Sequence, residues 1–95
     1  MREQTNGYAH DEIGKAYFEL KQFDKSYYHL KKAYETQCTD YYSSYVIALI
    51  YEQKGQLGKA IYHLIEVINS VPAFSKAYNK LGEIYLTKNE FEKAL

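Results

Sequence analysis

Residues 78–94 read YNKLGEIYLTKNEFEKA, with Leu81, Gly82 and Tyr85 spaced as neighbours on one face of a helix. An aliphatic, a small and an aromatic residue recur in the same order 34 and 68 positions earlier. The aligned trios are Leu81, Gly82 and Tyr85; Ile47, Ala48 and Tyr51; and Ile13, Gly14 and Tyr17. Further columns at this interval are Phe23, Leu57 and Phe91; Ser26, Ala60 and Ala94; Leu30 and Leu64; and Ala33 and Val67. Such a repeat predicts a stack of similar units, each burying its apolar face against the next.

Apolar residues within each unit recur at three- and four-residue steps, which is the period of an α-helix. The small residues Gly14, Ala48 and Gly82 let two helices approach closely, because a larger side chain there would push the backbones apart. We therefore predict helices near residues 8–20, 24–37, 41–54, 57–70 and 75–88, and the start of a sixth from about Glu90.

The breaks between the predicted helices fall at regular places. They are Lys21–Gln22, Lys54–Gly55–Gln56 and Lys88–Asn89. Gly55 and Asn89 are suited to the left-handed conformation that ends many helices. Asp24, Asp40 and Ser75 are the predicted N-caps of the second, third and fifth helices. Pro72 is predicted to end the fourth helix.

The columns resemble the tetratricopeptide repeat, a 34-residue helical hairpin. In that family the first helix runs aromatic, x, x, Leu, Gly, x, x, Tyr, and a small-residue column, an apolar column, Ala and Pro follow in the second. The third unit matches best, whereas Cys38 replaces the usual proline in the first, and His10 and Ser44 stand where an aromatic residue often sits. The resemblance covers everything after about Asn6.

This resemblance implies an all-α fold, a right-handed superhelical stack of antiparallel helix hairpins (a TPR-like α-solenoid). The expected organisation is one domain spanning residues 1–95 with about two and a half repeats. The repeats would occupy about 7–40, 41–74 and 75–95, and the last would be truncated.

Composition narrows the classes of function. Among 95 residues, 12 basic and 12 acidic side chains give a formal net charge of zero, which provides no field to attract nucleic acid. No apolar run approaches the roughly 18 residues that span a bilayer, and residues 1–7 lack the apolar core of a signal peptide. A single cysteine, Cys38, cannot form an intramolecular disulfide. We therefore expect a cytoplasmic protein without nucleic-acid binding or membrane insertion.

Catalysis has no support in the sequence. His29 and His63 share one repeat column on the second helices, where exposed polar side chains are normal, and no carboxylate or cysteine stands at metal-ligand spacing from any histidine. Cys38 has no catalytic signature around it, and no glycine-rich phosphate loop follows a strand. The prediction is a protein that is not an enzyme and that needs no cofactor or metal.

The sequence contains 12 tyrosines, and the repeat predicts different roles for some of them. Tyr17, Tyr51 and Tyr85 occupy one repeat column and are predicted core residues. In the resembled family, by contrast, the second, fifth, sixth, ninth, twelfth and thirteenth positions of each repeat line a concave groove. Those positions here are Tyr8, Asp11, Glu12, Lys15, Phe18 and Glu19; Tyr42, Tyr45, Val46, Leu49, Glu52 and Gln53; and Lys76, Asn79, Lys80, Glu83, Leu86 and Thr87.

Aromatic, aliphatic and charged side chains together suit a peptide-binding groove, since rigid rings supply contact area at low entropic cost. The alternative is that some of these tyrosines contact the preceding helix and leave no accessible patch. One subfamily clamps the C-terminal carboxylate of chaperones with two Lys, an Arg and two Asn. The matching positions are Asp11, Lys15, Val46, Lys76 and Lys80. Asp11 would repel a carboxylate and Val46 cannot bond to it, so such a clamp is not expected.

The leading hypothesis is a scaffold that binds a peptide or helix of a partner protein in the groove. One alternative is a structural spacer or oligomerisation element with contacts through its ends or convex face; another is a regulatory module attached to a catalytic domain. Leu95 falls about five residues into the predicted sixth helix, too short to be stable alone. We therefore expect a piece of a longer protein, and a second copy of the chain is the expected partner of its uncovered C-terminal end.

Overall fold

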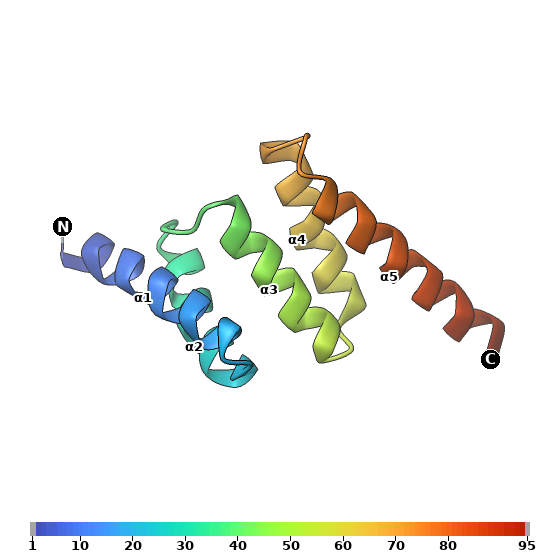
Figure 1. Ribbon diagram of the computed structural model, residues 1–95, viewed down its shortest axis with the longest axis horizontal. Coiled ribbons are helices and arrows are strands. Elements are labelled where there is room, and N and C mark those ends of the chain that lie inside the picture. The colour runs from blue at the N-terminus through green and yellow to red at the C-terminus, as the bar shows by residue number, and fades with distance from the viewer. Residues whose placement is uncertain (1, 95) are drawn as a thin grey trace.

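The computed structural model describes residues 2–94 and the side chains of residues 6–90. Its helices are α1 (Arg2–Glu19), α2 (Phe23–Glu35), α3 (Tyr41–Gln53), α4 (Leu57–Ser70) and α5 (Ser75–Ala94). Figure 1 shows α1 with α2 and α3 with α4 as two hairpins, followed by α5 against α4. The array is elongated, with extents of 49 × 27 × 20 Å. The predicted all-α stack of helix hairpins is confirmed.

Two helix boundaries differ from the prediction. The first helix begins at Arg2 rather than near residue 8. The predicted break at Lys88–Asn89 is wrong, because α5 continues through both residues to Ala94 and no separate helix starts at Glu90. Asparagine lowers helix stability by only a few tenths of a kcal/mol relative to lysine or glutamate, and good helix formers surround it. An intrinsic turn signal of this kind is too weak to end the helix.

The turns inside the two hairpins have the same geometry. Lys21 and Gly55, 34 positions apart, both take the left-handed conformation, with φ of 62° and 79°. In each turn the next residue donates a backbone hydrogen bond of 2.9 Å back into the helix, from Gln22 to Tyr17 and from Gln56 to Tyr51. Gly55 therefore takes the left-handed conformation predicted for it after the helix end. Lys21 takes the same conformation at the equivalent position, although it is not a glycine.

Of the three predicted N-caps, only Asp40 takes that role. Its carboxylate accepts a 2.9 Å hydrogen bond from the backbone N–H of Ser43. Asp24 and Ser75 lie inside the first turns of α2 and α5. As predicted, α4 ends before Pro72, at Ser70.

The core has two clusters, one on each side of α3. The first contains Leu30, Val46, Ile47 and Ile50. The second contains Ala48, Ala60, Leu64, Val67, Ala77 and Ile84. Tyr51 packs against both clusters, so α3 is the central element of the stack.

The repeat also holds for individual side-chain contacts. Tyr17 stacks on His29 with centroids 5.7 Å apart, and Tyr51 stacks on His63 at 5.4 Å. A lysine nitrogen lies 5.6 Å from each tyrosine ring centroid, from Lys25 in the first hairpin and from Lys59 in the second. Each residue of the second set follows its counterpart by 34 positions. The two hairpins therefore pack these side chains in the same way.

Two side chains are placed differently from the prediction. His63 is buried, with 7% of its surface exposed, although an exposed position was predicted. Tyr85 is 50% exposed, so its predicted place in the core is wrong. Among the described residues no helix covers that face of α5, whereas α2 and α4 supply rings against Tyr17 and Tyr51.

Candidate functional site

The predicted groove positions lie on α1, α3 and α5, the first helices of the successive units. Most of them have exposed or half-buried side chains. Those that are exposed are Tyr8, Glu12, Glu19, Gln53, Lys76, Asn79, Glu83 and Leu86. Those that are half-buried are Lys15, Phe18, Tyr42, Tyr45, Leu49, Glu52, Lys80 and Thr87. Val46 has no exposed surface and Asp11 only 5%, so these two lie beneath the surface that the others form.

Asp11 belongs to a polar network that joins α1 to the start of α3. The Ser43 hydroxyl donates to the Asp11 carboxylate, and it also lies 3.0 Å from Asp40 Oδ1. Lys15 Nζ lies 3.1 Å from Asp11 Oδ2 and 3.1 Å from Asp40 Oδ2. Burial alone would lower the pKa of Lys15, but these two carboxylates outweigh it and raise that pKa. The network holds the first hairpin against the second.

A second ion cluster joins α3 to α5. Lys80 Nζ lies 3.1 Å from Glu52 Oε1 and 3.0 Å from Glu83 Oε1. Burial again works to lower the pKa of the lysine, and the two carboxylates raise it overall. A carboxylate from a partner would have to displace these glutamates. Like Lys15, Lys80 therefore does not offer the open positive charge that a carboxylate clamp needs.

Between the two ion clusters runs a series of aromatic rings on α3 and on the link before α5. Tyr45 has its ring centroid 6.2 Å from that of Tyr42 and 5.2 Å from that of Phe74. Phe74, in the link before α5, in turn meets Tyr41 at 5.1 Å. Burial raises the pKa of Tyr45; Lys80 opposes that rise, while nearby Tyr42 and acidic side chains add to it. Tyr45 thus lies at the junction of the rings and the second ion cluster.

Phe74 and Tyr41 are absent from the predicted groove set. Both flank that set in sequence, because Tyr41 precedes Tyr42 and Phe74 lies in the link after Pro72. A large aromatic residue in a link where polar residues are usual is the signal that could have identified Phe74. On α1, Phe18 contributes a further ring, whose centroid lies 5.6 Å from that of the Phe23 ring.

The three histidines pack against other aromatic rings. His10 and His29 are stacked, with their Nδ1 atoms 2.8 Å apart, so one ring must donate and the other accept. Burial is the main cause that lowers the pKa of His29, and His10 and Lys32 add to it. Among the described side chains, those of residues 6–90, no three His, Cys, Asp or Glu residues converge as metal ligands. Residues 2–94 include no helix with the length and apolar character needed to cross a bilayer.

Comparison with known proteins gives one match. Residues 75–95 match the family model described as tetratricopeptide repeat. No curated protein and no solved structure matches the chain. The match covers α5, which lies third in a stack whose two earlier hairpins repeat each other's contacts at a 34-residue interval. The family match supports a tetratricopeptide repeat at residues 75–95, and the two earlier hairpins share the 34-residue period of that repeat.

Proposed function

We propose that this protein is a cytoplasmic scaffold that binds an extended or helical segment of a partner protein along the face formed by α1, α3 and α5. Tetratricopeptide repeats typically serve as non-catalytic surfaces for protein–protein interaction, which supports the general class. The single observation that carries the specific proposal is the aromatic series of Tyr42, Tyr45 and Phe74, placed between two ion clusters.

This surface has the composition of a binding site. Partly exposed rings provide apolar contact area with few side-chain torsions to immobilise, and binding energy at protein interfaces concentrates on such residues. Lys15 and Lys80 with their carboxylates place both signs of charge on either side of the rings. Charges at an interface rim favour one orientation of the partner more than they add affinity. A segment with apolar side chains flanked by charged ones fits this arrangement.

Replacing Tyr45 with alanine is expected to weaken binding of a groove ligand about tenfold, because a half-buried ring at the centre of an interface is a typical hot spot. The ligand would be a peptide selected from a random peptide library displayed on phage and then synthesised with a fluorescent label. Fluorescence anisotropy gives the dissociation constants, and circular dichroism checks that helicity is retained.

The matched control is Tyr62→Ala, the same substitution on α4, where Tyr62 is 58% exposed. Tyr62 lies outside the groove set, so binding should be unchanged. Equal loss of affinity in the two variants would contradict a groove on the first helices. Loss of helicity in Tyr45→Ala alone would show that Tyr45 serves the core instead.

The second candidate function is self-association through α5. A β-carbon added at Gly14 would meet Leu30 Cγ at 2.5 Å, whereas one added at Gly82 would meet nothing within 4 Å. Tyr78 and Tyr85, which flank Gly82 on this face, are also exposed. Gly82 therefore lies on a face of α5 that has the apolar side chains needed to pack against a helix. In the described part of the chain, no helix packs there.

Under this second candidate, sedimentation velocity should show dimers at high protein concentration, and Tyr85→Glu should shift the protein to monomers. The substitution places a charge where the second copy would bury an apolar ring, and the exposed position should leave the fold unchanged. A clean monomer at the highest attainable concentration would count against self-association and leave the groove proposal untouched.

A further inference from the structure

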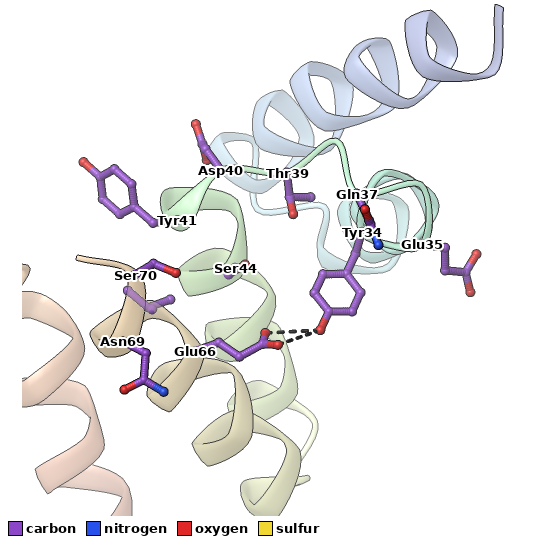
Figure 2. A pocket seen from close by; sticks show the side chains of 11 residues that line it. Tyr34, Glu35, Gln37, Thr39, Asp40, Tyr41, Ser44, Glu66, Asn69 and Ser70 are labelled. Atoms are coloured by element: carbon purple, nitrogen blue, oxygen red, sulfur yellow. Dashed lines mark hydrogen bonds between the residues drawn. The ribbon is translucent and has the colours of Figure 1, made fainter. Parts of the chain in front are cut away.

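A cleft on another side of the molecule separates the C-terminal ends of α2 and α4. It has a volume of about 700 Å³, and Tyr34 of α2 and Glu66 of α4 reach toward each other across it (Figure 2). A smaller depression of about 200 Å³ adjoins it, since Tyr34 and Glu35 line both. Rings of Tyr27, Tyr51 and His63 line the smaller part. The cleft thus combines a polar opening with an aromatic recess.

The charges around the larger part are negative. Glu35, Asp40 and Glu66 line it, and no basic side chain among the described residues does so; Lys31 lines only the smaller part. Asp40 is already paired with Lys15, which leaves the two glutamates. Two helix C-termini end at the cleft, and the last turn of α4 carries no basic side chain to offset the negative end of its dipole. The start of α3 also lies there, but Asp40 caps it. The arrangement favours a cation.

Glu66 is the central hydrogen-bond acceptor of the cleft. The single Tyr34 hydroxyl is shared between the two Glu66 oxygens, at 3.1 and 3.0 Å, although a carboxylate can accept about four hydrogen bonds. His63 Nδ1 is buried, lies 3.4 Å from Glu66 Oε1, and makes no hydrogen bond among the described residues. The Glu66 carboxylate therefore has capacity for further hydrogen bonds, and a ligand that donates here would use it.

We propose that this cleft binds the guanidinium group of an arginine in a partner peptide, with Glu66 as its main acceptor and the Tyr34 ring beside it. Arginine fits better than lysine because its planar, forked donors match a carboxylate and stack on aromatic rings. Glu35, exposed at the end of α2, adds attraction at longer range.

The centre of this site differs from that of the proposed groove, although the two share an edge. Tyr34 and Glu66 lie on the second helices α2 and α4, whereas the groove positions lie on α1, α3 and α5. Asp40 and Tyr41 line the cleft and also contact the groove side, through Lys15 and Phe74. Substitution of Glu66 therefore tests the cleft, and substitution of Tyr45 tests the groove.

The test uses the acetylated and amidated peptide Gly-Arg-Gly-Arg-Gly and its counterpart in which citrulline, a neutral residue of the same shape, replaces arginine. Nuclear magnetic resonance titration of the labelled protein should show shifts at residues 34–37 and 66–70 with the arginine peptide only. Glu66→Gln should weaken its binding about tenfold. Glutamine can still accept from Tyr34, so the fold should be retained. Glu90→Gln, an equal change in net charge on α5, should have no effect.

Three outcomes would overturn the proposal. The first is no binding of the arginine peptide, and the second is equal binding of the citrulline peptide. The third is equal weakening by Glu66→Gln and Glu90→Gln, which would indicate attraction by net charge alone. Shifts confined to residues 45–52 and 80–83 would assign the peptide to the groove and remove the cleft as its site.

Discussion

Replacing Gly14 with valine is expected to lower the free energy of unfolding by about 3 kcal/mol, at the upper end of the range for overpacked cores. A β-carbon at this position would lie 2.5 Å from Leu30 Cγ and 3.1 Å from the Leu30 backbone nitrogen. Leu30 is fully buried, so it has no open space into which it can move. The collision would separate α1 from α2, the two helices of the first hairpin. Urea denaturation followed by circular dichroism measures the change.

Gly82→Val is the matched control, because Gly82 occupies the same repeat column. A β-carbon there has open space around it, so only helix propensity should change, and valine is slightly more favourable than glycine. We expect a free energy of unfolding unchanged or raised by a few tenths of a kcal/mol. Equal destabilisation by both substitutions would mean that valine at this repeat position weakens the helix itself. The contact between α1 and α2 would then not explain the effect.

The contrast between Gly14 and Gly82 shows what the sequence can predict for this fold. Periodicity identifies the face of each helix that packs, because side chains three and four residues apart share a face. It therefore predicts the hairpins and the column to which both glycines belong. Whether a neighbour covers that face depends on a helix elsewhere in the chain, which no local pattern records. For this reason the repeat predicts Tyr85 in the core, whereas among the described residues its side chain is exposed.

The groove positions have the same limitation. Counting along the repeat identifies the outward side of α3, and Tyr42 and Tyr45 lie there in contact with each other. Counting does not show that Val46 is buried in the first core cluster, or that Asp11 accepts a hydrogen bond from the Ser43 hydroxyl. Those placements depend on how one hairpin packs on the next. Phe74 joins the rings from a link, where the helical period gives no guide.

His63 is the clearest case of a side chain whose surroundings the sequence does not reveal. Its ring stacks on Tyr51 and meets the edges or faces of Tyr34 and Tyr62 at centroid distances of 5.0 and 5.3 Å. Burial lowers its pKa below the ordinary value of 6.5, although nearby Glu66 acts in the opposite direction. The unfolded chain therefore binds a proton at a pH where the folded protein does not. Protonation favours unfolding, and stability should fall as pH decreases through about 6.5.

His63→Phe is expected to raise the free energy of unfolding by about 2 kcal/mol at pH 7.5, because it removes a buried nitrogen without a hydrogen bond and keeps the stacked ring. The gain should be larger at pH 5.5, since phenylalanine cannot take up a proton. Some pH dependence should remain from His29, whose pKa is also lowered. Urea denaturation at both pH values measures the difference. Parallel changes in the wild-type protein and the variant would contradict this reasoning, because they would mean that His63 titrates alike in the folded and unfolded states.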